Sequence, residues 1–235
     1  MAQTFRPALW PTLFTIPAII VLLGLGTWQV QRMTWKNDVI ARIEQRLSDA
    51  PVALQRTLDD VDAWEYRRVT VSGRFLHDRE QYLLANEKRG VSGYHVVTPL
   101  ERADGGGTVL VNRGWVPPER KAAAARADGQ PGGVVTVTGV VRKPWHQGWF
   151  VPDNNVAKNI WFFGDAAAMA RAMNVSAPAY FIDADASANP GGLPRGGQTR
   201  VDIPNNHWQY AITWYAFSIV LLVIYFVWHR KQGRA

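Results

Sequence analysis

One histidine of the chain lies where it could bind a metal or a cofactor. His207 follows two asparagines in PNNHWQYAIT and precedes a long run without charged residues. A helix that starts there carries four further side chains on the face of His207, at offsets of three, four, seven and eleven: Tyr210, Ala211, Trp214 and Ser218. An imidazole, a small residue and flat aromatic rings along one stripe could hold a large planar ligand. Neutral imidazole is also a standard axial ligand of haem iron.

A second group of residues is expected at the same depth. The first apolar run of the chain ends at Trp28, Gln29 and Arg32, and two antiparallel helices would bring that end level with His207. The alternative is that the aromatic rings here form a belt at a membrane surface, with His207 hydrated beside them. Trp214 fits such a belt less well, because at a rise of 1.5 Å per residue it lies about 10 Å further along the helix than His207.

The rest of the chain lacks the spacings of an enzyme site, and we expect a protein that is not an enzyme. His77, His95 and His146 do not pair at the three- or four-residue spacing of helical metal ligands, so each is expected on the surface or in a hydrogen bond. Asp183 and Asp185 are expected to be solvated. The chain has no cysteine, which excludes thiolate metal sites. Its net charge of +7 is spread along the chain without a nucleic-acid motif, so no nucleic-acid partner is expected.

Two long apolar runs predict membrane-spanning helices. Residues 7–31 carry no charge, and between Asp202 and Trp228 the only His, Asp, Glu, Lys or Arg is His207. Each run exceeds the roughly 20 residues that cross a bilayer core. The predicted organisation is a tail at 1–10, a span at 11–31, an exported domain at 32–206, a second span at 207–228 and a basic tail at 229–235.

The flanks of the two runs predict the topology. No small-x-small cleavage site follows the first run, which leaves as GTWQVQRMTWK, so we expect a retained anchor rather than a signal peptide. The basic C-terminal tail HRKQGRA favours both tails in the cytoplasm. The N-terminal tail is too short and too poor in Arg and Ser for a transit peptide. These features predict a bacterial inner membrane protein with its large domain in the periplasm.

The segment between the spans has the pattern of a β-rich domain. Residues 32–47 have helical spacing and are expected to extend the first helix. Five stretches read as strands: YRRVTVSGRFL, EQYLLAN, GYHVVTPL, TVLVNRGWV and GGVVTVTGVVRKP. APAYFID adds a late strand, and 164–174 is a short helix with Asp165 at its N-terminus. The glycines inside VTVSGRF and VTVTGVV mark bulges or tight bends. We therefore predict an α+β domain, with a barrel as one arrangement of its strands.

Several segments resemble, in their order along the chain, the Surfeit locus protein 1 family of cytochrome c oxidase assembly factors. They are GTWQVQRMTWK, EYRRVTVSGRF, GYHVVTPL, VLVNRGWVP, VPDNNVAKNIWF and GGQTRVDIPNNHWQYAITWY. The resemblance covers nearly the whole chain. It implies a membrane protein that receives haem a from haem a synthase and promotes its insertion into the haem-bearing subunit of the terminal oxidase.

The resemblance also implies that His207 is the axial ligand of the haem a iron. The porphyrin would lie against the second helix and opposite the end of the first, and its propionates would pair with arginines that flank the spans. The cofactor-binding residues expected in this way are His207, Tyr210, Ala211, Trp214, Trp28, Gln29, Arg32 and Arg200. The arginines could equally contact lipid headgroups. The family commonly has leucine directly after the histidine, where this chain has Trp208, which puts the shape of the pocket in doubt.

Two other functions remain open at this point. The protein could be a membrane scaffold that recruits the synthase and the oxidase subunit without binding haem itself. It could also be a membrane redox enzyme that uses a haem. Electron transfer is disfavoured because the second histidine in this part of the chain, His229, is expected at the opposite face of the membrane.

Overall fold

The computed structural model describes residues 8–86, 90–144, 147–199, 201 and 203–232. The chain divides into two compact units. The first contains residues 1–42 and 202–235, and the second contains residues 43–201.

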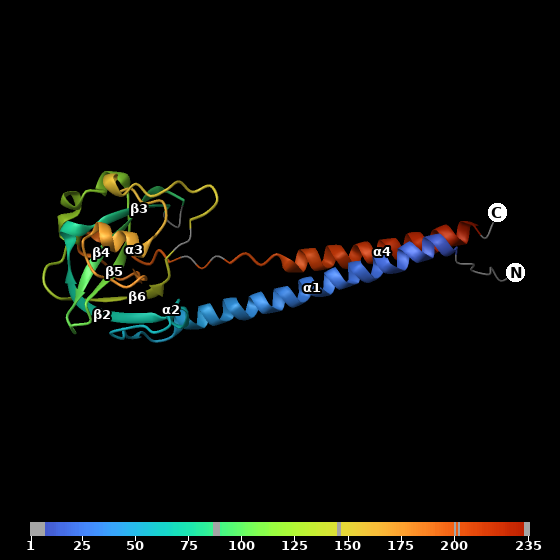
Figure 1. The fold of residues 1–235 in the computed structure, drawn as a ribbon, viewed down its shortest axis with the longest axis horizontal. Helices are drawn as coiled ribbons and strands as arrows, with labels where there is room; N and C mark the ends of the chain where they lie inside the picture. The colour runs from blue at the N-terminus through green and yellow to red at the C-terminus, as the bar shows by residue number, and fades with distance from the viewer. Residues whose placement is uncertain (1–7, 87–89, 145–146, 200, 202, 233–235) are drawn as a thin grey trace. The chain divides into compact units, whose positions relative to one another are not determined.

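The first unit is a pair of long helices (Figure 1). Helix α1 runs from Leu9 to Ser48 and helix α4 from His207 to Gln232. Both are long and apolar enough to cross a membrane. Helix α4 begins at the predicted residue, and α1 continues without a break through the segment 32–47, which confirms the predicted extension of the first helix.

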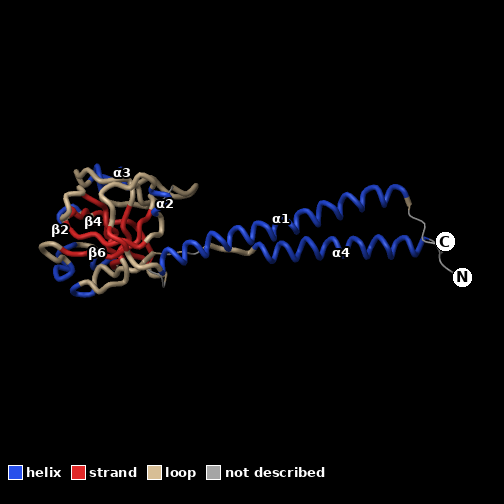
Figure 2. The backbone as a smooth tube through the Cα atoms, turned by 90° about the horizontal axis from the view of Figure 1, so that it is seen from below, coloured by secondary structure: helices blue, strands red, loops and turns tan. Residues whose placement is uncertain are grey.

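The two helices pack side by side and antiparallel (Figure 2). Near one end the hydroxyl groups of Thr12 and Tyr225 lie 2.7 Å apart, and those of Thr27 and Tyr215 lie 3.2 Å apart further along. Large apolar side chains away from this contact are exposed, among them Phe14 and Ile219. Such a surface is unfavourable in water and is the one expected of helices in contact with lipid.

The second unit is built on one sheet of seven strands. Their bounds are β1 Val52–Ala53, β2 Arg68–Phe75, β3 Gln81–Asn86, β4 Ser92–Arg102, β5 Thr108–Val116, β6 Val135–Arg142 and β7 Phe181–Ala184. The helices are α2 Val61–Trp64 and α3 Ala166–Ala172. Short 3₁₀ turns are η1 His77–Arg79, η2 Pro118–Arg120, η3 Ala123–Gly129, η4 Val156–Lys158 and η5 Pro190–Gly192.

Five of the strands close into a barrel. Strand β2 pairs with β6 on one side and with β4 on the other, so that the ring runs β2-β6-β7-β5-β4 and returns to β2. Within the ring only β5 and β7 are parallel. This cyclic order is that of the Greek-key barrel known as the OB-fold, which serves proteins of many functions. The predicted α+β domain is confirmed, with the barrel as its arrangement.

Two glycines allow the barrel strands to bend and approach closely. Gly73 pairs with both Val135 and Arg102, at the point where β2 leaves β6 for β4. A Cβ atom at Gly73 would lie 2.2 Å from the carbonyl oxygen of Glu101, and one at Gly139 would lie 2.5 Å from that of Asp183. Any larger residue would collide with the neighbouring backbone. The register is continuous through both glycines, so they permit close approach of the strands and do not mark the predicted bulges.

Two apolar cores hold the second unit together. The first fills the barrel with side chains from all five of its strands, including Val71, Leu100 and Ile182. The second lies where α3 covers the sheet, around the fully buried Trp161. Helix α3 begins as predicted, because the Asp165 carboxylate accepts a hydrogen bond of 2.9 Å from the Ala168 amide and satisfies one N–H of its first turn.

Candidate functional site

His207 is held at the first residue of α4 by a side chain of α1. Its Nδ1 atom lies 2.7 Å from Oε1 of Gln29. Because an amide oxygen can only accept, Nδ1 carries a proton, and in the tautomer that makes this contact the lone pair is on Nε2. Histidines that bind metals in proteins almost always donate their other N–H in this way. His207 is half-buried, and the pair is prepared to offer one ring nitrogen to a metal ion.

The segment just before α4 is fixed to the same stretch of α1. The Lys36 ammonium donates to the carbonyl oxygen of Pro204, and the Asn205 amide donates to Oδ1 of Asn37 at 2.7 Å. The Asn205 side chain is thus used between the helices and not as a cap of α4. These two contacts, which sequence reasoning missed, fix the position of His207 along the helix axis relative to Gln29.

The predicted stripe on α4 divides between two environments. Ala211 and Ser218 are each 5% exposed and Trp214 is half-buried, so these three face α1. Tyr210 is 57% exposed and Trp208 is 51% exposed, so their rings point away from the helix contact. The five residues of the stripe lie on α4 with the predicted helical spacing, but only Ala211, Trp214 and Ser218 face α1.

The helices approach too closely at this level to hold a flat ligand between them. A Cβ atom at Gly26 would lie 2.7 Å from the ring of Tyr215, and Ala211, one turn before Tyr215 on α4, is buried. On α1, Gln29 is half-buried whereas Trp28 is 53% exposed. The exposed aromatic rings near His207 are therefore on the outside of the helix pair. They are Trp28 on α1 and, on α4, Tyr210 and Trp208, which are two residues apart and so lie on nearly opposite sides of the helix.

One of the two predicted arginines can be located. Arg32 is exposed on α1, three residues after Gln29, with its guanidinium 4.1 Å from the centre of the Trp35 ring. Stacking on an aromatic face leaves the donors at the edge of the guanidinium directed outward, where they can meet an anionic group. Arg200 lies outside the described residues.

His229 has a structural role at the far end of the helix pair. Its Nε2 accepts a hydrogen bond of 3.0 Å from the Ala8 amide, and its Nδ1 lies 2.8 Å from the Tyr225 carbonyl oxygen. Both ring nitrogens are thus engaged. Since His207 and His229 are 22 residues apart on one helix, about 33 Å separates them at 1.5 Å per residue. The two histidines cannot ligate one iron.

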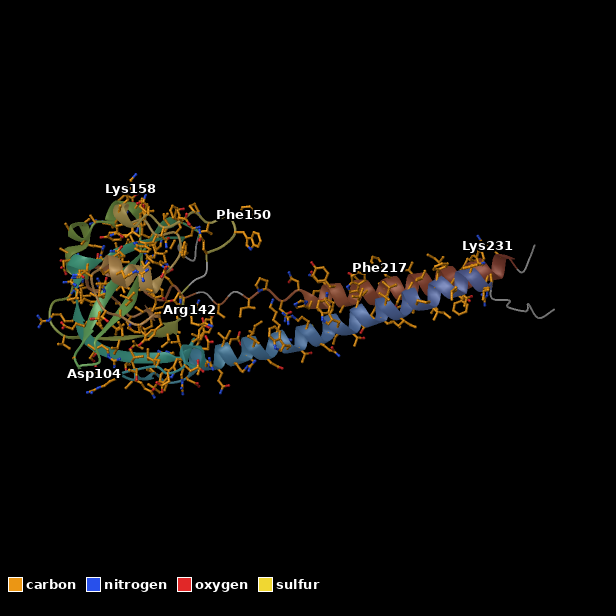
Figure 3. The ribbon with its side chains drawn as sticks, in the orientation of Figure 1. Asp104, Arg142, Phe150, Lys158, Phe217 and Lys231 are labelled. Atoms are coloured by element: carbon orange, nitrogen blue, oxygen red, sulfur yellow. The ribbon has the colours of Figure 1, made fainter. Side chains whose placement is uncertain are left out.

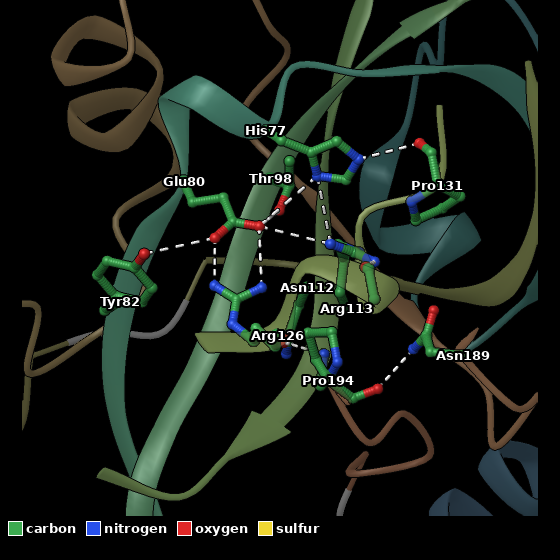
Figure 4. A network of polar contacts seen from close by, with 12 residues as sticks. His77, Glu80, Tyr82, Thr98, Asn112, Arg113, Arg126, Pro131, Asn189 and Pro194 are labelled. Carbon is green, nitrogen blue, oxygen red and sulfur yellow. Dashed lines mark hydrogen bonds and ion pairs between the residues drawn. The ribbon is translucent and has the colours of Figure 1, made fainter. Parts of the chain in front are cut away.

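A buried cluster of charges lies inside the second unit (Figure 4). The carboxylate of Glu80 accepts hydrogen bonds from both terminal nitrogens of Arg126, and its Oε1 lies 3.4 Å from Nη1 of Arg113. Thr98 and Tyr82 donate to the same carboxylate at 3.4 Å. The side chains of Glu80 and both arginines are 2% exposed. One carboxylate thus meets two guanidinium groups in a site that excludes water.

The charges of the cluster shift the pKa values of its members. Burial alone would raise the pKa of Glu80, but the hydrogen bonds from His77 and Arg126 and the charges of both arginines lower it to about 2. Burial lowers the pKa of Arg113 to about 10, against the opposing effect of Glu80. At neutral pH Glu80 and Arg113 are therefore both ionised. The role of the cluster is structural, because its ion pairs hold Arg126 of η3 against the barrel through Glu80 and Arg113.

The structure tests the sequence interpretation of the remaining polar residues. His77 is confirmed as a hydrogen-bonded histidine, with Nε2 3.1 Å from the Pro131 carbonyl oxygen. His95 is hydrogen-bonded as well, since its Nδ1 lies 3.3 Å from the amide of Asn112. His146 lies outside the described residues. Among those that are described, no group of three or more His, Cys, Asp or Glu could hold a metal ion.

The expectation that Asp183 is solvated is wrong. Asp183 is buried on β7, between β5 and β6, where burial raises the pKa of its carboxyl group. Asn112 and Thr199 donate to it at 3.0 and 3.3 Å. A short strand in the middle of a barrel has neighbours on both sides, so its polar residue is paired inside the protein. Asp185, just beyond the strand, is partly exposed beside Arg68.

Comparison with known proteins places the chain in a family. The family model described as "SURF1 family" matches residues 16–219. The "SURF1-like protein" of Monosiga brevicollis is 40% identical over 96% of this chain and 89% of its own length. Surfeit locus protein 1 of Rattus norvegicus is 39% identical over 96% and 76%, and that of Homo sapiens is 40% identical over 88% and 73%. The chain belongs to the SURF1 family.

Proposed function

We propose that this protein is an assembly factor for cytochrome c oxidase that binds haem a through His207 and passes it to the haem-bearing subunit. Membership of the SURF1 family supports the role in oxidase assembly. The observation that supports a haem site most directly is the contact of 2.7 Å between Nδ1 of His207 and Oε1 of Gln29. It holds the imidazole in the tautomer whose Nε2 can bind iron.

The residues around His207 fit a haem held by one protein ligand. When bound, haem a would supply the iron and the porphyrin, and the chain would supply a single imidazole with a fixed orientation. Tyr210, on the same face of α4 as His207, would offer aromatic surface beside it, with Trp28 on α1, and Arg32 would pair with a propionate. A single ligand suits transfer, because only one iron–nitrogen bond must break when the haem leaves.

We place the porphyrin on the outer surface of the helix pair and not between the helices. The close approach of Gly26 to Tyr215 and the burial of Ala211 leave no room for a ring at that level. Trp214, which faces α1, would then support the packing of the helices. The contribution of Tyr210 would come from its exposed ring.

The proposed location is a bacterial inner membrane, with the barrel unit in the periplasm and both tails in the cytoplasm. Two antiparallel spans place both ends of the chain on one side, and the basic residues after Trp228 favour the cytoplasm for that side. The relatives named above are eukaryotic. Haem a synthase and the oxidase subunit are the proposed partners, in the same membrane.

A scaffold without haem is the second candidate, and one observation favours it. The helix pair is closely packed at the level of Ala211, which is what a protein needs when the helices serve only as an anchor. In that case the barrel unit would recruit the partners, and His207 with Gln29 would only strengthen the helix contact.

The spectrum of the purified protein distinguishes the two candidates. The full chain is expressed with the enzymes of haem a synthesis, purified in detergent, and compared with His207→Ala and His229→Ala. His229 is the matched control, because it is also an α4 histidine and bonds to Ala8, the residue before α1. We expect haem a in the wild type and in His229→Ala, and loss of haem from a folded His207→Ala. Equal haem content in all three proteins would contradict the proposal, and haem in none would favour the scaffold.

A further inference from the structure

Two adjacent aromatic side chains in the second unit are completely exposed. Trp149 is 100% exposed and Phe150 is 99% exposed. Figure 3 shows Phe150 at the tip of a loop, with its ring directed away from the barrel. Single exposed apolar residues are ordinary on a protein surface, but two large neighbouring rings that no described part of the chain covers indicate a surface that is buried in use.

The two rings are presented by an ordered turn. The Val151 amide donates to the Gly148 carbonyl oxygen at 3.0 Å, which puts Trp149 and Phe150 at the two central positions of the turn. The Gln147 side chain braces it, since its amide donates to the Val151 carbonyl oxygen at 2.8 Å and to Asp153 at 3.0 Å. The exposure of the rings is therefore built into the local backbone.

The chemistry of the turn suits the interfacial layer of a bilayer. The stretch QGWFVP at 147–152 contains no charged residue. Lys143, before the loop, is paired with Asp62 at 2.7 Å and Glu65 at 3.1 Å and does not bring a free charge to the turn. Tryptophan and phenylalanine are the side chains that anchor proteins at this depth, where an indole N–H can still meet polar headgroups.

A short segment connects this unit to the apolar helix α4. Only residues 202–206 separate Val201, the last residue of the barrel unit, from His207, where the apolar helix α4 begins. Six steps of at most about 3.3–3.6 Å each limit that distance to roughly 20 Å, whatever the orientation of the unit. A surface attached by so short a tether is present at high effective concentration. We propose that the turn Gly148–Val151 inserts Trp149 and Phe150 into the interfacial layer of the membrane that holds α1 and α4.

The absence of cysteine makes the test direct, because any introduced thiol is the only one in the chain. Val151→Cys keeps both rings and receives a thiol-reactive fluorophore. Val134→Cys, at an exposed position before β6, is the matched control. The full chain is placed in lipid nanodiscs, which leave both membrane faces open to solvent. Fluorescence is quenched either by lipids with brominated acyl chains or by iodide in the water.

We expect the probe at position 151 to be quenched by the brominated lipids and protected from iodide, and the probe at position 134 to behave in the opposite way. Replacing both rings, Trp149→Ser with Phe150→Ser, in the Val151→Cys protein should abolish the lipid quenching and restore quenching by iodide. The thermal midpoint should stay the same, because both side chains are exposed. Equal iodide quenching at 151 and 134 in lipid alone would overturn the proposal. Protection at 151 that requires added oxidase subunit would overturn it too, and would identify a protein partner for the rings.

Discussion

Replacing Glu80 with glutamine should destabilise the barrel unit by about 3 kcal/mol. The pKa of this carboxyl group falls from an ordinary 4.5 to about 2, and at about 1.4 kcal/mol per pKa unit the difference corresponds to about 3 kcal/mol. The side chain is 2% exposed, so solvent does not screen this contribution. Glutamine has the same shape but no charge, and it would leave Arg113 and Arg126 buried without a counterion. Breaking a buried ion pair in this way costs about 3–5 kcal/mol, which agrees with the first estimate.

The pH dependence of stability gives an independent check. Because the folded-state pKa of Glu80 is lowered, its contribution to stability is fully present above pH 4.5 and is lost as the pH falls towards about 2. Glutamine does not titrate. The gap between the unfolding midpoints of the wild type and Glu80→Gln should therefore be constant above pH 4.5 and should close on further acidification.

Thermal unfolding in detergent, followed by circular dichroism of the aromatic side chains, measures both effects. For a chain of this size each kcal/mol shifts the midpoint by about 2–4 °C, so we expect a decrease of roughly 6–12 °C at pH 7. Asp104→Asn is the control, because the Asp104 side chain is 47% exposed and its partner, the buried Arg102, still donates to the carbonyl oxygens of Leu54 and Gln55. The loss of stability at Asp104 should therefore be smaller than that at Glu80. A loss at Glu80 no larger than that at Asp104, or a gap that persists to the lowest pH, would refute this account of the cluster.

Three further substitutions test other parts of the structure. Gln29→Leu should weaken haem a binding by about 10–100-fold, the usual effect of removing the partner of a ligating histidine; titration with haem a would show this, and an unchanged affinity would remove Gln29 from the site. Gly73→Ala should lower stability by about 1–3 kcal/mol or more, since its Cβ would lie 2.2 Å from a backbone oxygen; an unchanged unfolding midpoint would contradict the bend. Gly26→Val should separate the helices, because even a Cβ would lie 2.7 Å from the Tyr215 ring; spin labels on the two helices should then move apart, and an unchanged distance would argue against close packing.

The elements of the fold could be predicted because each depends on a local pattern. The length of the apolar runs gave both long helices, and the alternation of valine with polar residues gave the strands. Closure of the barrel could not be derived in this way. Closure requires β2 to pair with β4 as well as with β6. That double pairing is possible because Gly73 has no side chain to collide with the backbone of β4.

Buried polar residues were the least predictable feature. Glu80 and Arg126 are 46 residues apart, and nothing in the spacing of either residue shows that the fold brings them together. Asp183 alternates with Asp185 like a residue of an exposed strand end, yet β7 is enclosed by two neighbours. Whether a charged residue is solvated depends on the strand order, which sequence alone does not supply.

The contact between His207 and Gln29 has a consequence for transfer of the cofactor under the proposed function. The histidine is on α4 and the glutamine that fixes its tautomer is on α1, so the ligand is fully prepared only while the helices are paired at this level. Lys36 and Asn37 strengthen the pairing just beyond it, through Pro204 and Asn205. A partner that loosens these contacts would free Nδ1 of His207, reduce the basicity of its ring towards iron and lower the affinity for haem without touching the haem itself. Release at the oxidase could thus be controlled by the packing of two helices.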